Sequence, residues 1–244
     1  MEKYLAKRIL VYLALLAFGF AYFQGILNPT KPLGFGQTRQ ISLANETWVD
    51  DDYNESTPGW GFSHFNKIQN GINSVASGGT VHVASGSYYE NAVVNRTILL
   101  AGEEQNRTII DGNYTRDFAL TVTSNYVSIR GFTIQNCIYL GRETGGLDIS
   151  SWYNRISNID FIQNWIDITV FGKHNRISSC TMNASFWNTK IFGDNNSFLG
   201  NHLSNSYTAL SLNAARENSV ENNTIVNEYI GISLDLRRNW LVSH

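Results

Sequence analysis

The sequence predicts an all-β protein that winds as a parallel β-helix, a solenoid with about 21 to 22 positions in each coil. The first observation is an asparagine that returns along the chain, at Asn125, Asn154, Asn175, Asn196 and Asn218, so that the intervals are 29, 21, 21 and 22. The second is that an apolar residue follows each asparagine two and seven places later, and self-similarity at this period is typical of solenoids. The third is that a coil this short has no room for the helix of a βαβ crossover.

Each coil is predicted to contain two or three short strands, because apolar residues two apart lie on one face of a strand. The column two places after the asparagine contains Val127, Ile156, Ile177, Phe198 and Val220. The column seven places after it contains Phe132, Phe161, Met182, Leu203 and Ile225. Apolar pairs before the last asparagines predict one more strand, as at Leu147 and Ile149, Ile168 and Val170, and Leu210 and Leu212. Stacked coils would align each column inside the body.

Stacking at about 4.8 Å would also bring the five asparagines into a ladder at one turn. Asparagine tolerates left-handed backbone angles, and its amide can bond to the coils above and below. We therefore expect the ladder to be structural. The alternative is that the asparagines present their amides to a ligand.

The N-terminal part divides into a leader and a linker. In residues 1–27, three basic residues precede an apolar run that extends from Ile9 to Phe23. The length of this run lies between that of a signal-peptide core and that of a membrane-spanning helix, so a signal peptide and a membrane anchor both stay open. We expect the rest of the chain to be exported to the cell surface, extracellular space or periplasm, anchored through residues 9–27 if the leader is kept. Residues 28–47 read as a linker.

Residues 48–79 are predicted to contain one strand and one helix. The apolar residues on one face of a helix over residues 63–76 are Phe65, Ile68, Ile72 and Val75. Ser63 is expected to cap the start of this helix, and Gly78 and Gly79 to end it. We expect the helix to cover the open N-terminal end of a β-helix that continues over residues 80–244, since exposed core and strand edges need a cover.

Five segments in this order resemble the N-terminal part of pectin-lyase-like right-handed parallel β-helix proteins. They are residues 48–53 (WVDDDY), 65–72 (FNKIQNGI), 79–83 (GTVHV), 86–91 (GSYYEN) and 108–112 (TIIDG). In particular the chain resembles the NosD-like repeat proteins of the carbohydrate-binding-and-sugar-hydrolase family, which are exported surface proteins. The resemblance covers roughly residues 48–240 and implies a right-handed, single-stranded coil. It specifies the fold far more than any activity.

Two further features bear on the compartment. Eight Asn-x-Ser/Thr sequons are candidate glycosylation sites in an exported chain; they start at Asn45, Asn54, Asn95, Asn106, Asn113, Asn183, Asn195 and Asn222. Cys137 and Cys180 occupy different places in the repeat, and stacking would set them roughly 10 Å or more apart, too far for a disulfide. We expect two buried thiols that pack as small apolar groups.

The chain has 20 acidic and 18 basic residues and no basic tract, so nucleic acid is not an expected partner. No metal or other cofactor is predicted. The three aspartates at 50–52 lack the alternating spacing of a calcium loop and read as a solvated strand end. The NosD-like resemblance suggests copper, and His174, Cys180 and Met182 are soft or borderline ligands close in sequence. Cys180 and Met182 fit core positions better.

A polar strip is predicted on the outside of the strand that precedes the asparagine. The residues between its apolar pairs are Asp148, Thr169, Lys190, Ser211 and Ser233. Lys190, the aromatic pair Phe171 and Phe192, and Asn213 are candidate ligand-binding residues, because sugars need hydrogen-bonding partners and flat apolar surfaces. Arg142 joins them from the loop at residues 137–146, which contains the surplus of the first interval, and solenoid insertions often lie on the binding face.

Asp148 and Asp167 belong to adjacent coils, with an expected separation of about 8 Å. Paired carboxylates at about 6.5–9.5 Å are the geometry of inverting glycoside hydrolysis, so these two are the catalytic candidates. The alternative is that both only keep the strip soluble. The motifs of pectin-cleaving enzymes are missing from the sequence, which has no Gly-His-Gly, no Arg-x-Lys and no paired aspartates on a coil strand.

The leading hypothesis is therefore an exported, non-catalytic module with a structural or carbohydrate-binding role at the cell surface, whose partner is a polysaccharide or surface glycan. The first alternative is a polysaccharide-cleaving enzyme, either a glycoside hydrolase or a lyase, that acts on the exterior strand groove. The second is a periplasmic, copper-associated NosD-like protein. The last coil has no recognisable cap before His244, so self-association or a longer-chain partner at that end is also expected.

Overall fold

The computed structural model describes residues 43–114, 117–138 and 144–235. The predicted leader and most of the predicted linker lie outside these ranges, as does Arg142. Among the residues that are described, no helix is both long enough and apolar enough to cross a bilayer.

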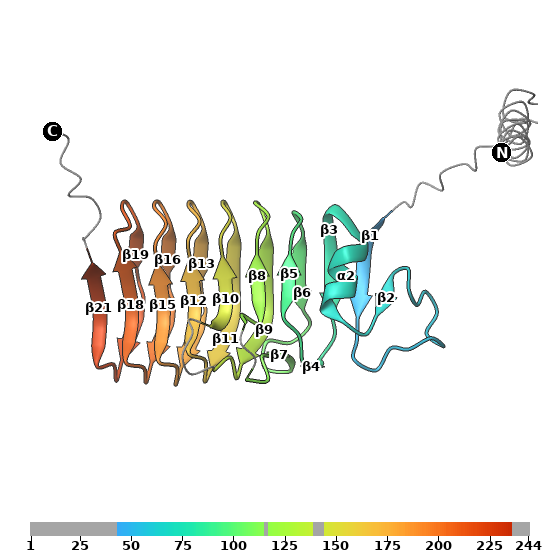
Figure 1. The fold of residues 1–244 in the computed structure, drawn as a ribbon, viewed down its shortest axis with the longest axis horizontal. Helices are drawn as coiled ribbons and strands as arrows, with labels where there is room; N and C mark the ends of the chain where they lie inside the picture. Colours follow the sequence, from blue (N-terminus) through green and yellow to red (C-terminus); the bar gives the residue numbers. More distant parts are fainter. Residues whose placement is uncertain (1–42, 115–116, 139–143, 236–244) are drawn as a thin grey trace, which may run out of the picture. The chain divides into compact units, whose positions relative to one another are not determined.

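The described body is a parallel β-helix of two sheets whose coils stack along one axis (Figure 1). Sheet A has 14 strands, and its main path runs β19-β16-β13-β11-β9-β6-β3-β1-β2. Sheet B has 7 strands in the order β21-β18-β15-β12-β10-β8-β5. Strands pair in parallel with their equivalents in the next coil, as predicted.

The main path of sheet A comprises β1 (Ala44–Val49), β2 (His64–Phe65), β3 (Val75–Val83), β6 (Leu99–Gly102), β9 (Ser128–Gln135), β11 (Arg155–Ile162), β13 (Arg176–Ser178), β16 (Ser197–Leu199) and β19 (Ser219–Glu221). Its remaining strands are β4 (Gly86–Tyr88), β7 (Thr108–Asp111), β14 (Thr181–Asn183), β17 (His202–Ser204) and β20 (Thr224–Val226). Sheet B comprises β5 (Ala92–Val94), β8 (Leu120–Val122), β10 (Gly145–Ile149), β12 (Ile166–Val170), β15 (Trp187–Ile191), β18 (Thr208–Asn213) and β21 (Ile230–Asp235).

The predicted apolar columns are confirmed from the second repeat onward. Ile156 pairs with Ile177, which pairs with Phe198, and the three side chains are at most 1% exposed. The first repeat is out of register, because Ile129 rather than Val127 lies opposite Ile156. The predicted alignment of that copy is therefore wrong by two positions.

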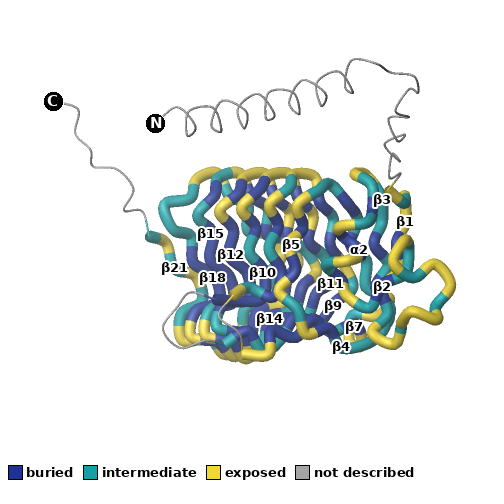
Figure 2. The backbone as a smooth tube through the Cα atoms, turned by 45° about the vertical axis from the view of Figure 1, so that its right-hand side comes forward, coloured by how far each residue is buried: buried dark blue, intermediate teal, exposed yellow. Residues whose placement is uncertain are grey.

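The columns form one continuous core between the sheets. Buried residues line the strands, and exposed segments gather at the bends between them (Figure 2). Phe132, Phe161 and Phe198 are among the largest fully buried side chains. Burial of each such side chain contributes about 1.5–3 kcal/mol, so the stacked interior is the main source of stability.

The asparagine ladder is present over four of the five predicted positions. The side-chain oxygen of Asn175 accepts the backbone N–H of Asn154 at 2.9 Å, and that of Asn196 accepts the N–H of Asn175 at 2.8 Å. Asn218 continues the pattern with the N–H of Asn196 at 2.7 Å. Asn125 instead accepts the N–H of Trp152, because its repeat is out of register.

The prediction that the ladder asparagines adopt left-handed angles is wrong. The residue before each one takes that conformation instead, with φ between 56° and 60° at Tyr153, His174, Asn195 and Glu217. The ladder side chains turn inward, and Asn154 and Asn175 are 1% exposed. Their amides thus satisfy buried backbone groups, which fits the structural role expected of them.

Helix α2 (Ile68–Ser74) is shorter than predicted, and β3 follows it directly. Ser63 does not cap it, because the N-cap residue is Lys67. The carboxylate of Glu90, from a later coil, accepts the N–H groups of Ile68 at 2.7 Å and Gln69 at 3.1 Å. The amide of Gln69 in turn bonds to both backbone groups of Val93 in β5, the edge strand of sheet B.

The surplus residues of the first interval lie in the connection between β9 and β10, within the predicted loop at 137–146. Cys137 and Cys180 are free and buried, as predicted, and burial raises the pKa of each thiol to about 12. β21 is the last strand of the described part, with Ile232 51% and Leu234 63% exposed. The absence of a C-terminal cap stays a prediction, because residues 236–244 lie outside the described chain.

Candidate active site

The predicted polar strip exists on sheet B. Asp148 pairs with Thr169, Thr169 with Lys190, and Lys190 with Ser211, so the four residues form one outward row. Asp148 is partly buried, and this burial raises its pKa to about 6 against the lowering effect of the Ser150 hydroxyl. Its Oδ1 is buried, and no residue in the described part of the chain forms a hydrogen bond with it.

The prediction that Asp167 lies outside with Asp148 is wrong. Asp167 has no exposed surface, and the equivalent position one coil earlier, Gly146, faces the core side chains of Ile134 and Phe161. Burial raises the pKa of Asp167 to about 7, although three side chains donate hydrogen bonds to its carboxylate. These donors are Asn164 at 2.9 Å, Ser185 at 2.6 Å and Asn188 at 2.9 Å. Asp148 and Asp167 therefore do not form a pair that faces a substrate.

The predicted ligand-binding residues also lie around sheet B. Lys190 holds its ammonium 4.6 Å from the centroid of the Trp187 ring and is 9% exposed. Phe171 and Phe192 stack with centroids 4.9 Å apart. The amide of Asn213 donates to Ser211 of its own strand.

The row itself offers little surface to a polymer. Thr169 is 2% and Ser211 4% exposed. These two positions therefore present almost no surface to an extended polysaccharide.

The three residues considered as copper ligands, His174, Cys180 and Met182, lie apart in the structure. Met182 and Cys180 are at most 1% exposed and belong to the core, and His174 stacks outside on Tyr153 at 4.8 Å. These three residues do not converge on one site.

An open groove lies on sheet A instead, across the outer faces of β1, β3, β6 and β9. Its cavity measures about 540 Å³. The lining residues are Trp48, Val49, Asp50, Tyr53, His82, Val83, Ala84, Ala101, Gly102, Glu103 and Arg130. Small residues form the floor, whereas aromatic and charged side chains stand around it.

One wall of the groove is an aromatic stack. His64 and His82 pair in register with Trp48 from either side, and both imidazoles stack on the indole, with centroids 5.3 and 5.5 Å away. Nε2 of His82 lies 3.9 Å from the carboxylate of Glu46. Both faces of Trp48 are therefore covered, and the exposed aromatic face of the stack is that of His82.

Two carboxylates flank the floor. The last paired residues of β1, β3 and β6 lie side by side, and the residues that follow them are Asp50, Ala84 and Glu103. This places the two carboxylate-bearing residues two strand spacings, or about 10 Å, apart across Ala84. The backbone N–H and hydroxyl of Ser85 donate to Glu103, which holds its pKa below the usual range.

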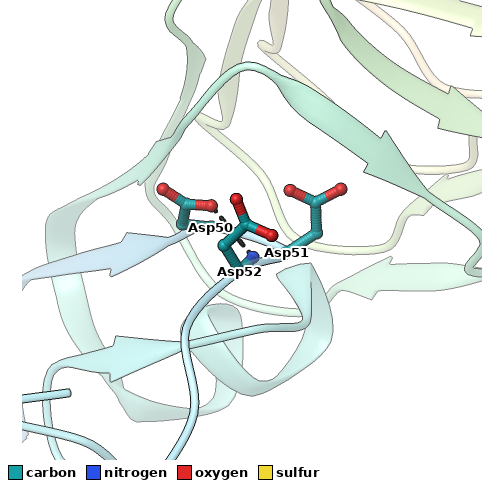
Figure 3. A group of neighbouring side chains, drawn as sticks. All are labelled: Asp50, Asp51 and Asp52. Carbon is teal, nitrogen blue, oxygen red and sulfur yellow. Dashed lines mark hydrogen bonds between the residues drawn. The ribbon is translucent and has the colours of Figure 1, made fainter. Parts of the chain in front are cut away.

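Asp50 begins an acidic turn, for which the sequence predicts only a solvated strand end (Figure 3). Carboxylate oxygens of Asp50, Asp51 and Asp52 come within 4.8 Å of one another. Asp50 accepts the N–H of Asp52 at 3.0 Å, and Asp51 accepts the N–H of Ser87 at 3.1 Å. These bonds give the aspartates a local structural role.

Sequence reasoning missed the groove, although a signal was present. In the predicted strand 80–83, His82 occupies the outward position between two apolar residues, as Asp148 does in its own strand. The early coils differ in length, so the alignment of His82 with Trp48 and Arg130 does not follow from a constant interval.

No family model matches this sequence, and no curated protein matches it either. Among solved structures, a pectin methylesterase from carrot is similar at 10% identity and a TM-score of 0.43, over 75% of this chain and 83% of that one. A pectin methylesterase from Yersinia enterocolitica is similar at 11% identity and a TM-score of 0.43, over 63% of this chain and 66% of that one. The pectin methylesterase PemA from Erwinia chrysanthemi is similar at 12% identity and a TM-score of 0.40, over 69% of this chain and 66% of that one.

These structures correct the leading sequence-based hypothesis. A non-catalytic structural or carbohydrate-binding role was predicted, whereas the solved structures found are named as pectin methylesterases, so that prediction is not retained. At this identity the likeness concerns the fold and transfers no residue role. The described body is a parallel β-helix by its own strand pairing.

Proposed function

We propose that the protein is a polysaccharide-modifying enzyme that hydrolyses glycosidic bonds in the groove on sheet A. The observation that carries the proposal is the open cavity of about 540 Å³ in which an aromatic stack, two carboxylates and a guanidinium converge. A concave site with a few convergent polar groups is the default location for ligand chemistry. The row on sheet B has a carboxyl with a raised pKa, but its positions Thr169, Lys190 and Ser211 are buried.

The two carboxylates suit inverting hydrolysis. The bonds from Ser85 keep Glu103 ionised, as required of a base that takes a proton from water. Asp50 lies across Ala84 and is the second carboxyl, which has to carry the proton that the leaving oxygen takes up. The backbones that carry the two side chains lie about 10 Å apart. Inverting hydrolysis needs about 6.5–9.5 Å between the carboxyl groups, which leaves room for the attacking water.

The test is a reducing-end assay on a panel of neutral and acidic polysaccharides, with the full-length protein. We expect Glu103→Gln and Asp50→Asn each to lower kcat by at least about 100-fold, because general acid and base catalysis contribute 10²–10⁴-fold. Asp148→Asn is the matched control, since it removes a carboxyl with a raised pKa outside the groove.

Two results would refute this assignment. Wild-type protein that turns over no polysaccharide in the panel would remove the enzymatic proposal. Loss of turnover in Asp148→Asn, with Glu103→Gln unaffected, would return the site to sheet B.

We further propose that the enzyme is an exported, NosD-like repeat protein that meets its substrate outside the cytoplasm. The resemblance at residues 48–112 and the apolar leader support this proposal. Seven of the eight sequon asparagines are exposed, and the eighth, Asn183, is half-buried, so the chain leaves them accessible to a glycosylating host. Fractionation of native cells that express the protein with or without residues 1–27 measures both its export and its retention on the membrane.

A further inference from the structure

The aromatic stack on sheet A ends where a side chain is too small to continue it. The outward row runs His64, Trp48, His82, Ala101 and Arg130, each residue paired in register with the next. The first three carry rings that stack at 5.3 and 5.5 Å. Ala101 occupies the fourth position and leaves the ring of His82 without a ring on its other side. The row therefore has an empty layer above Ala101.

The empty layer has the dimensions of one flat guest. His82 and Arg130 lie two strand spacings apart, or about 9.6 Å, across Ala101. Van der Waals contact needs about 3.5–4.0 Å on each face, so a layer of this height holds one ring. Elsewhere on this protein neighbouring coils fill such layers themselves, as Trp165, Phe186 and Tyr207 do at 4.5 and 5.1 Å.

The charges around this layer select the guest. Asp50 and Glu103 line the same cavity, and Glu103 is held ionised, whereas Arg130 is the one guanidinium in the lining. Asp51 and Asp52 add negative charge beside Asp50. A sugar with its own carboxylate would meet repulsion from these groups, whereas the hydroxyls of a neutral sugar would donate hydrogen bonds to them.

We infer that the layer above Ala101 is a sugar-binding subsite, in which one neutral pyranose ring of a polysaccharide lies between His82 and Arg130. The inference rests on the proposed function, which supplies the polysaccharide as the ligand. It adds where one sugar unit of that polysaccharide binds, and that this unit is uncharged. The ring completes the stack that Ala101 interrupts. Asp50 and Glu103 then lie along its edge.

The test is isothermal titration of the full-length protein with cellohexaose, mannohexaose and xylohexaose, and with hexagalacturonate as the acidic comparator. We expect at least one neutral hexasaccharide to bind and hexagalacturonate to bind at least about tenfold more weakly. His82→Ala should weaken binding about tenfold, since it removes a stacking face. Ala101→Tyr should abolish binding, because its ring occupies the layer. Ser178→Tyr, further along the same outward row and outside the cavity, is the control that keeps wild-type affinity.

The outcomes separate this inference from the proposed hydrolysis. Binding of a neutral hexasaccharide without turnover supports the subsite and contradicts the enzyme. Binding or turnover confined to hexagalacturonate, or full affinity in Ala101→Tyr, overturns the subsite and leaves hydrolysis standing. If the control Ser178→Tyr also loses binding, the loss in Ala101→Tyr reflects disruption of sheet A. The smaller substitutions Ala101→Gly and Ala101→Val then decide: full affinity in Ala101→Gly together with loss of binding in Ala101→Val would support the subsite. Equal affinity in those two variants would overturn it.

Discussion

Glu103 and Asp167 carry the same functional group, and the fold gives the two carboxyls opposite properties. Glu103 lies in solvent, and the two hydrogen bonds from Ser85 lower its pKa. Asp167 also receives hydrogen bonds, but complete burial outweighs them and raises its pKa to about 7. Desolvation disfavours a charge more than neutral donors can compensate. This difference makes Glu103 a candidate base and Asp167 a structural residue.

Asp167 predicts a stability that depends on pH. Its pKa is about 7 in the folded chain and about 3.9 in an unfolded one, so the folded state holds the proton more tightly. The contribution to stability is complete below about pH 4 and is lost as the pH rises through 7. The Asp167→Asn variant does not titrate, so its stability has no such dependence on pH. If the side-chain amide of Asn188 flips, its Oδ1, which has no partner among the described residues, can accept a hydrogen bond from the new amide at position 167.

Urea unfolding at pH 5 and pH 8 measures this effect. We expect the stability of Asp167→Asn relative to wild type to improve by a few kcal/mol between the two pH values, since one pKa unit corresponds to about 1.4 kcal/mol. A difference that is the same at both pH values would contradict the raised pKa.

The ladder asparagines predict a graded cost of truncation. Asn175→Ala removes the acceptor of the buried N–H of Asn154 and the donor to the carbonyl of Ser151. An unsatisfied buried group costs about 1–3 kcal/mol, so we expect a loss of roughly 3 kcal/mol. Asn218→Ala, at a partly buried rung, should cost roughly 1 kcal/mol. Equal losses in urea denaturation would show that burial does not set the cost.

Among the elements, α2 depends on distant residues for its start. A helix of 7 residues is too short to be stable alone. The carboxylate of Glu90 caps its first N–H groups, and Gln69 ties it to the edge of β5. The helix and the first strand of sheet B are thus one unit.

This coupling gives a prediction for Glu90→Ala. We expect a loss of about 1–2 kcal/mol, typical of a lost N-cap, together with faster amide exchange in both α2 and β5. Glu55→Ala, in an exposed turn, is the control and should change neither quantity. Faster exchange confined to α2 would mean that Gln69 does not link the helix to the sheet.

Across the described body as a whole, the later coils are interchangeable. Residues 156, 177 and 198 pair in sequence, as do 161, 182 and 203, so each coil presents the same surface to the next. Stability in such a body is a sum over coils and the contacts between them. The chain should therefore tolerate loss of one complete coil.

Deletion of residues 176–196, one full repeat, tests this. We expect a folded protein with cooperative unfolding, because Ser197 then takes the place of Arg176 beside Arg155 and keeps the register. Deletion of residues 176–195 should prevent folding, since a shift of one residue turns core side chains outward. Circular dichroism and urea unfolding distinguish the two, and a folded product from the shorter deletion would contradict the register.

The repeat pattern was enough to predict the solenoid, because a short, nearly constant period with paired apolar positions has few other solutions. It also placed Asp148, Thr169, Lys190 and Ser211 in one row, since strict alternation holds along extended strands. The inward direction of Asp167 could not be predicted in this way, because β12 departs from strict alternation there and the neighbours Asp167 and Ile168 are both buried.

The groove likewise emerged only from the folded arrangement. It joins Trp48, His82 and Arg130 across coils of unequal length, and the paired backbones alone fix that register. The cap of α2 is of the same kind, since Glu90 is distant in sequence from the N–H of Ile68 that it accepts. Local patterns specify strands and their repeat, whereas contacts between coils specify which side chains meet.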